Sequence, residues 1–220
     1  MLPILTLCLL LAPAPEGRFP DSQYARYTWQ TFLALPALRD TLDLANPDYS
    51  LLNAAVFYVT NRERQRSNRP PLEFDPRLRD MADHHAAAMA RYRFVSHVNP
   101  HDAQSRSFEQ RAGRFQPHAG AENVASEFLY DYEPGSLYYR KAAPGGYRFY
   151  DQQDRLILRH TYLSFAETLV AGWMNSRGHR ANILHPSLRT LGCAVRLSAG
   201  ETGSDEIPLA YAVQNFGWRR

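Results

Sequence analysis

Two stretches of alternating apolar residues near the carboxyl end constrain the fold of this chain most strongly. Apolar side chains recur at every second position over residues 191–197 and again over residues 209–213, with a glycine-containing loop between them. A period of two is typical of a strand with one buried face, so the pair predicts an antiparallel hairpin. Because helices are expected elsewhere in the chain, the hairpin indicates an α+β domain.

The strongest helix is predicted in the segment FDPRLRDMADHHAAAMARYRF, where Asp75 is expected as the N-cap and Pro76 as the first helical residue. Its apolar stripe comprises Leu78, Met81, Ala82, His85, Met89 and Tyr92. Another helix is expected from Asp48 to about residue 67, because apolar residues recur there at helical spacing.

Two capping boxes predict the starts of two further helices. Ser107 with Gln110 and Ser164 with Glu167 have the spacing of an N-cap hydroxyl and its reciprocal partner. A tyrosine-rich segment at about residues 128–162 predicts a second hairpin that turns around residues 144–146.

The bulk properties predict one globular domain with an extension. The chain has 220 residues, of which 45% are hydrophobic. Its net charge of +3 comes from scattered arginines, which argues against a nucleic-acid partner. No apolar run reaches the roughly 18 to 20 residues that a membrane-spanning helix needs, so no transmembrane span is expected in the mature chain.

The amino-terminal residues resemble a secretory signal. Residues 1–14 are apolar and end in small residues and prolines, although a positive n-region is missing. We therefore expect a signal peptide and leader over residues 1–20, a helical arm over 21–47, and a secreted, periplasmic or cell-envelope location. The alternative is a misassigned start or a short apolar segment. A mature chain would keep Cys193 and lose Cys8, so no internal disulfide is expected.

Three candidate chemical groups lie at the ends of predicted elements. His97 follows the long helix, Glu122 lies in a turn-like segment, and His179 follows Gly178, which is expected to end a helix. Two imidazoles and a carboxylate could bind a divalent cation or share protons around a polar ligand. The alternative is that each histidine satisfies backbone groups or packs under a loop.

Other sites have little support. The chain has no H-E-x-x-H, paired-cysteine, G-x-S-x-G, P-loop or G-x-G-x-x-G motif, which disfavours the corresponding enzyme classes. His85 falls on the apolar stripe and is expected in the core, whereas His84 is expected at the surface. Cys193 alternates with core residues and is expected to be a buried, unreactive thiol.

Several motifs in order resemble the CAP superfamily of cysteine-rich secretory, antigen 5 and pathogenesis-related 1 proteins. They are N-x-x-R at Asn61–Arg64, the SH ending at His97, the AEN containing Glu122, GWMNSRGHRANIL at residues 172–184 and YAVQNFG at residues 211–217. The form of the fourth motif is similar to the bacterial, disulfide-free branch. The resemblance covers residues 48–217 and implies an α-β-α sandwich with a central antiparallel sheet.

The resemblance also implies a cleft over the paired histidines. His97, Glu122 and His179 match three of its four typical residues, and Ser176 stands where eukaryotic members have a second glutamate. Trp173 would anchor its helix in the core, while Gly178 would let the chain turn. Residues expected to support the cleft structurally are Asn61, Arg64, Asn123, Trp173, Arg180 and Asn182.

Three functions follow as expectations. The first is an exported binding module that holds a polar ligand, a lipid or cell-envelope component, or a cation such as zinc at His97 and His179, with no cofactor required. The second is a hydrolase of peptides or cell-wall polymers in which Glu122 acts as general base. The third is a structural protein. The tyrosine-rich insertion would form either a lid beside the cleft or a structural flap.

Overall fold

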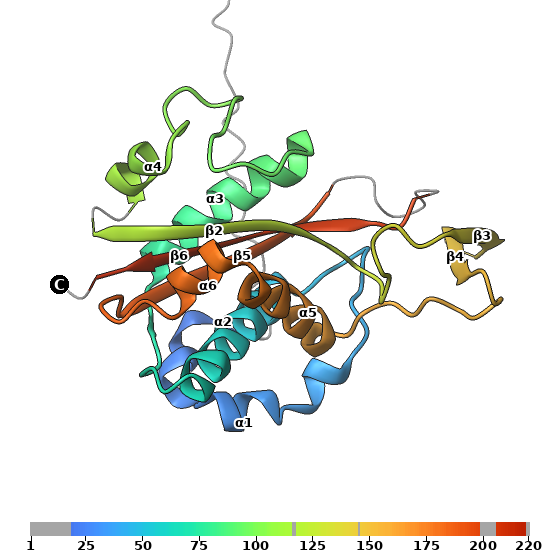
Figure 1. Ribbon diagram of the computed structural model, residues 1–220, viewed down its shortest axis with the longest axis horizontal. Coiled ribbons are helices and arrows are strands. Elements are labelled where there is room, and N and C mark those ends of the chain that lie inside the picture. The colour runs from blue at the N-terminus through green and yellow to red at the C-terminus, as the bar shows by residue number, and fades with distance from the viewer. Residues whose placement is uncertain (1–18, 116–117, 145, 199–205, 219–220) are drawn as a thin grey trace, which may run out of the picture.

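A four-stranded sheet forms the centre of the protein in this computed structural model, which describes residues 19–115, 118–144, 146–198 and 206–218. The strands lie in the order β1-β5-β6-β2 (Figure 1). They comprise β1 (Glu73–Phe74), β2 (Ala119–Phe128), β5 (Thr190–Leu197) and β6 (Leu209–Gly217). β6 is antiparallel to both β5 and β2, which confirms the carboxyl-terminal hairpin. The short β1 pairs with β5 in parallel, so the sheet is mixed.

Helices cover both faces of this sheet. α3 (Pro76–Tyr92) packs on one face against β5 and β6, with α4 (Phe108–Phe115) beside it. α2 (Tyr49–Arg66) and α5 (Tyr162–Asn175) lie on the other face (Figure 1). This α-β-α arrangement confirms the predicted fold class. No helix in the described part of the chain is long and apolar enough to cross a membrane.

The helix starts confirm two capping predictions and correct a third. Asp75 accepts a hydrogen bond from the backbone of Arg77 at 2.8 Å, and Pro76 is the first residue of α3. Ser107 and Gln110 bond reciprocally at the start of α4. α5, however, begins at Tyr162, because Thr161 is the N-cap and Ser164 completes its capping box.

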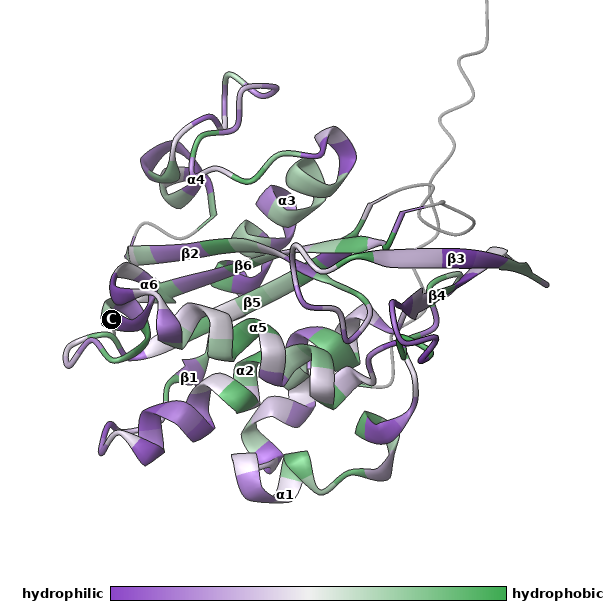
Figure 2. Ribbon diagram, turned by 45° about the vertical axis from the view of Figure 1, so that its right-hand side comes forward, coloured by the Kyte–Doolittle hydropathy of each residue, from purple (hydrophilic) through white to green (hydrophobic). Residues whose placement is uncertain are grey.

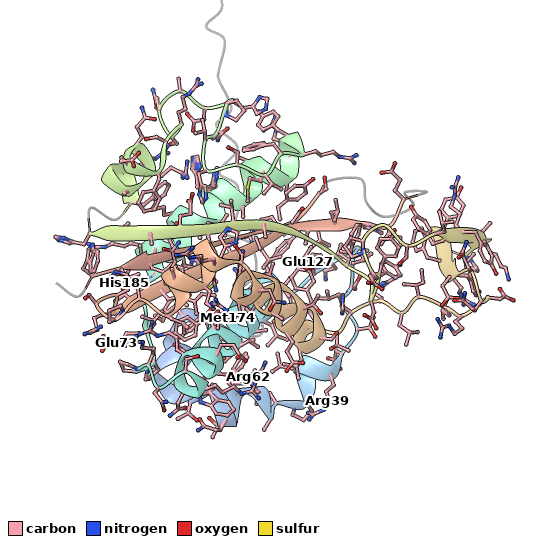
Figure 3. The ribbon with its side chains drawn as sticks, viewed as in Figure 1. Arg39, Arg62, Glu73, Glu127, Met174 and His185 are labelled. Atoms are coloured by element: carbon pink, nitrogen blue, oxygen red, sulfur yellow. The ribbon has the colours of Figure 1, made fainter. Side chains whose placement is uncertain are left out.

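Glu167 therefore has a role other than capping. Its carboxylate forms an ion pair with Arg62, which Figure 3 labels on α2. The contact joins the two helices that cover the same face of the sheet.

The amino-terminal arm consists of three short helices rather than one. They are η1 (Asp21–Arg26), α1 (Trp29–Leu33) and η2 (Pro36–Arg39). Thr28 begins α1 through a capping box with Thr31, and Pro36 begins η2. Buried side chains from the arm, among them Phe32 and Leu38, join the large core cluster on the α2 side of the sheet. The expected leader lies largely outside the described residues.

The predicted tyrosine-rich hairpin is present. β3 (Tyr138–Ala143) pairs with β4 (Gly146–Asp151) in a separate two-stranded sheet. It is fastened to the domain by Phe149, which is buried and contacts Tyr130 edge to face. Figure 1 shows this hairpin beyond the carboxyl end of β2, away from α6 (Arg177–Ile183).

The contact between α3 and β5 depends on Gly192. A Cβ at this position would lie 2.0 Å from the backbone nitrogen of Arg79, which is far inside van der Waals contact. The start of α3 therefore approaches the sheet backbone as closely as a residue without a side chain permits. This approach fixes α3, and with it the loop that follows α3.

Candidate functional site

The site is centred on a hydrogen bond between His97 and Glu122. His97 lies in the loop after α3, and Glu122 lies on β2. His97 Nδ1 is 2.9 Å from Glu122 Oε1. The Glu122 side chain is 2% exposed, whereas that of His97 is 54% exposed. The buried carboxylate therefore fixes the orientation of the exposed His97 ring. Nε2 is the nitrogen of that ring that remains available to bind a ligand.

Arg111 on α4 supplies the counter-charge to Glu122. Its side chain is fully buried, and its Nη2 lies 2.9 Å from both carboxylate oxygens. The same guanidinium donates to the backbone carbonyl of His97 at 3.0 Å and to those of Ser105 and Arg106. Arg111 thus neutralises the buried acid and also fastens the His97 loop to α4.

Asn215 on β6 completes the surroundings of the carboxylate. It lies opposite Glu122 in the β2–β6 register. With its amide nitrogen turned toward the acid, it donates to Glu122 Oε2 at 3.2 Å and accepts from the Ala82 backbone at 3.0 Å. Glu122 is therefore bonded by three side chains, from the His97 loop, α4 and β6.

The two histidines have opposite electrostatic surroundings. The hydrogen bond with Glu122 raises the pKa of His97 above its usual value, against the smaller opposing effect of burial. Burial lowers the pKa of His179, and the charge of His97 lowers it further. The two imidazoles are therefore within electrostatic reach of each other, and near neutral pH His97 is the more readily protonated of the two.

His179 reaches this position differently from what the sequence suggested. α5 ends at Asn175, and Ser176 with an extended backbone separates it from α6. Gly178 lies inside α6 and does not end a helix, so the turn predicted at Gly178 occurs at Ser176. His179 is consequently presented from a short helix and not from a loop.

A buried amide network fastens α6 to the sheet. Asn182 donates to the side-chain oxygen of Asn123 at 2.9 Å and to the backbone carbonyl of Glu122 at 3.3 Å. Asn123 in turn donates to the carbonyl of His179 at 3.2 Å and to Gln214 at 3.1 Å. Gln214 then donates to Thr60 on α2 at 2.6 Å. These contacts align α6 with the residue that holds His97.

The other residues expected to support the cleft have different surroundings. Arg64 is buried and donates to the carbonyls of Ile183 and His185, which hold the end of α6. Asn61 bonds both backbone groups of Leu72, and Trp173 is buried in the core. Arg180 is exposed on α6, and its role in fastening the turn stays a prediction.

His85, His84 and Cys193 have mainly structural surroundings. His85 is buried, and its Nε2 lies 2.8 Å from the Ser96 carbonyl, which confirms its place in the core. Burial lowers its pKa to about 4. His84 is half-buried, not a surface residue, and lies 3.5 Å from Asp102. Cys193 is buried as predicted, and burial raises the pKa of its thiol.

Arg111, Asn215 and Gln214 were not predicted from the sequence as parts of the site. A signal existed for Arg111, because it is an arginine beside the apolar stripe of a short amphipathic helix. Gln214 and Asn215 lie in the quoted YAVQNFG motif, where two consecutive polar residues interrupt a strand that is buried on both faces.

The site offers two imidazole side chains as ligands for a metal ion. In the described part of the chain, no group of three or more His, Cys, Asp or Glu side chains is arranged to hold a metal ion. A cation held here would therefore be bound by His97 and His179 together with water or a ligand. In Figure 2, α6 beside the site is largely hydrophilic, whereas α4 carries both hydrophilic and hydrophobic residues.

Comparison with known proteins gives the family. The cysteine-rich secretory protein family, CAP, matches residues 57–216, and the chain belongs to it. No curated protein matches the chain.

Among solved structures, an extracellular SCP-domain protein of Bacillus anthracis is 22% identical to this chain, with a TM-score of 0.49. The match covers 79% of this chain and 42% of the Bacillus anthracis protein. An outer surface protein of Borrelia burgdorferi is 15% identical, with a TM-score of 0.45, and the match covers 76% of this chain and 92% of that protein. A cysteine-rich secretory protein of Staphylococcus aureus is 12% identical, with a TM-score of 0.41, and the match covers 77% of this chain and 39% of that protein. The chain thus spans less than half of the first and third proteins.

Proposed function

We propose that this protein is an exported CAP-domain binding module that holds a polar ligand or a divalent cation between His97 and His179. The observation that carries the proposal is the burial of Glu122 and the number of side chains bonded to it. Its carboxylate is almost fully buried and is bonded by Arg111, His97 and Asn215. A general base must reach the proton that it removes, and this carboxylate is already engaged on all sides.

Glu122 instead resembles a group that positions a metal-binding side chain, namely the ring of His97. A carboxylate that accepts from one ring nitrogen of a histidine orients the ring and makes the other nitrogen a better metal ligand. His179 adds an imidazole whose lowered pKa favours the neutral form that metals bind. Both features support reversible binding more than turnover.

A second candidate is a metal- or imidazole-assisted hydrolase of peptides or cell-wall polymers. The observation in its favour is again His179, because a neutral imidazole close to a protonated one can accept a proton from water. In such a reaction His179 would be the base, and Glu122 would only orient His97.

Calorimetric titration of the full chain with Zn²⁺ at neutral pH tests the proposal. We expect saturable binding that His97→Ala and His179→Ala each weaken by at least about tenfold, since each removes one of the two ligands. The matched control is His101→Ala, which removes an exposed imidazole from the same loop.

Equal zinc affinity in all four proteins would overturn the metal version of the proposal. Release of products from peptide or cell-wall substrates would establish the second candidate, provided that His179→Ala abolishes it.

A further inference from the structure

A cavity lies beside the tyrosine-rich hairpin, outside the site at His97 and Glu122. It has a volume of about 560 Å³ and is lined by residues from the segments 131–137 and 151–158. Both segments belong to the connection between β2 and α5, at the end of the molecule away from α6 (Figure 1). The volume falls in the range of small-molecule pockets, which is about 300 to 1,000 Å³.

Hydrogen bonds within the chain hold the two walls of the cavity. The backbone amide of Asp131 donates to the carbonyl of Leu158 at 2.8 Å, which joins the two segments. The amide of Ile157 donates to the backbone of β4 at 2.9 Å. The Tyr132 hydroxyl donates to the carbonyl of Ser136 at 2.7 Å, which closes the turn in the other segment. The cavity is thus formed before any ligand enters, so binding does not have to order its walls.

Three exposed leucines line the cavity. Leu137 is 70% exposed, Leu156 45% and Leu158 63%. Leu156 and Leu158 alternate with the half-buried Ile157 in a segment that forms bridges to neighbouring strands. Side chains two residues apart in an extended segment point to the same side, so these two leucines share one wall. Exposed apolar side chains that gather in one concavity are typical of an interaction site.

The charged side chains of the lining leave two acids without a counter-charge. Arg155 is engaged by Asp151 at 2.7 Å. Asp131 and Glu133 are exposed, and neither carboxylate has an ion pair or a side-chain hydrogen bond within the described part of the chain. Asp131 also acts on the buried His160, but burial lowers the pKa of that ring, which is therefore mainly neutral at pH 7. The cavity consequently combines apolar side chains with two unpaired negative charges.

We infer that this cavity docks an extended segment of a partner protein in which apolar side chains alternate with lysine or arginine. Leu156 and Leu158 belong to one segment of the lining, and the two unpaired acids belong to the other. Neighbouring side chains of an extended peptide point to opposite sides, so such a peptide can present apolar groups to the leucines and cations to the acids. The same acids disfavour an anionic membrane surface as the occupant. The inference does not depend on the function proposed for the histidines.

Three capped hexapeptides are suitable probes. They are LKLKLK, the charge-reversed LELELE, and SKSKSK, which lacks the apolar side chains. Calorimetry measures their binding to the full chain at neutral pH. We expect saturable binding of LKLKLK that is at least about tenfold tighter than that of the other two, since LELELE is repelled by the acids and SKSKSK buries little apolar surface. The net charge of +3 would by itself favour LELELE, so non-specific attraction gives the opposite order.

Two variants with matched controls locate the binding. Glu133→Gln should weaken LKLKLK binding by about two- to five-fold, as expected for one exposed ion pair. Glu109→Gln removes an exposed acid on α4 and should leave binding unchanged. Leu158→Ser should weaken binding by about five-fold or more, because an apolar contact is lost. Val95→Ser changes an exposed apolar residue in the loop after α3 and should have no effect. All four side chains are exposed, so we expect the variants to fold.

Equal binding of the three peptides, no saturable binding, or equal losses in the variants and their controls would each overturn the inference. A second copy of this chain is the alternative occupant. Sedimentation that shows a dimer of the full chain, abolished by Leu158→Ser, would establish that alternative and overturn the inference.

Discussion

Arg111 Nη2 lies 2.9 Å from both carboxylate oxygens of Glu122, and both side chains are buried. Removing one partner of such a pair leaves an uncompensated buried charge. Arg111→Met should therefore lower the free energy of unfolding by about 3 to 5 kcal/mol. Denaturant unfolding at neutral pH measures this change.

An exposed ion pair provides the control for that prediction. Arg66 bonds Glu63 on α2 and is 61% exposed. Arg66→Met should cost less than about 1 kcal/mol, because solvent screens exposed pairs. If both variants lost a similar amount of unfolding free energy, the buried pair of Arg111 and Glu122 would contribute no more to stability than an exposed pair.

The two histidines should titrate on opposite sides of the ordinary histidine pKa of 6.5. His97 should titrate above it, because its hydrogen bond to Glu122 stabilises the charged ring. His179 should titrate below it, because of burial and the charge of His97. NMR titration of the ring protons measures both. In His97→Gln the midpoint of His179 should rise, and an unchanged midpoint would refute the interaction.

Stability should depend on pH through His97. Because folding raises its pKa, its contribution to stability is fully present below the unfolded pKa of about 6.5 and is lost as the pH rises through the folded pKa. The difference in unfolding free energy between wild type and His97→Gln should therefore be largest in mild acid and decrease toward alkaline pH. A difference that grows with pH would contradict this sign.

The amide network should be needed to hold α6. Asn182→Ala removes the donor to Asn123 and to the Glu122 carbonyl, which leaves buried acceptors without that partner. We expect a loss of about 1 to 3 kcal/mol in unfolding free energy. Asn175→Ala, at the exposed end of α5, is the control and should be nearly neutral. Hydrogen exchange of the α6 amides should accelerate only in the Asn182 variant.

Two glycines should respond in opposite directions to alanine. Gly192→Ala should destabilise the protein by several kcal/mol or prevent folding, because its Cβ would overlap the backbone of α3. Gly172 lies in α5 with open space around a Cβ. Gly172→Ala should raise stability by about 0.5 to 1 kcal/mol, since alanine favours helix. Thermal unfolding compares the two, and destabilisation by both would refute the distinction.

Much of the fold could be predicted from local patterns. The alternation over residues 191–197 and 209–213 predicted the β5–β6 hairpin, and Asp75 with Pro76 predicted the start of α3. Local patterns were less reliable where two interpretations compete. At α5 both Thr161 and Ser164 can cap, and the upstream hydroxyl does so. At residues 172–184 a glycine suggested a helix end, but Gly178 continues α6.

The sequence by itself determined the helix and strand periods, the caps of α3 and α4, the buried positions of His85 and Cys193, and the family motifs, because these depend on residues close together in the chain. Only the tertiary structure decided that Arg111, Asn215 and His97 meet at one carboxylate. These residues come from α4, β6 and a loop, and no local spacing relates them. The physical reason is that a buried charge needs partners from every direction, and only packed elements can supply them.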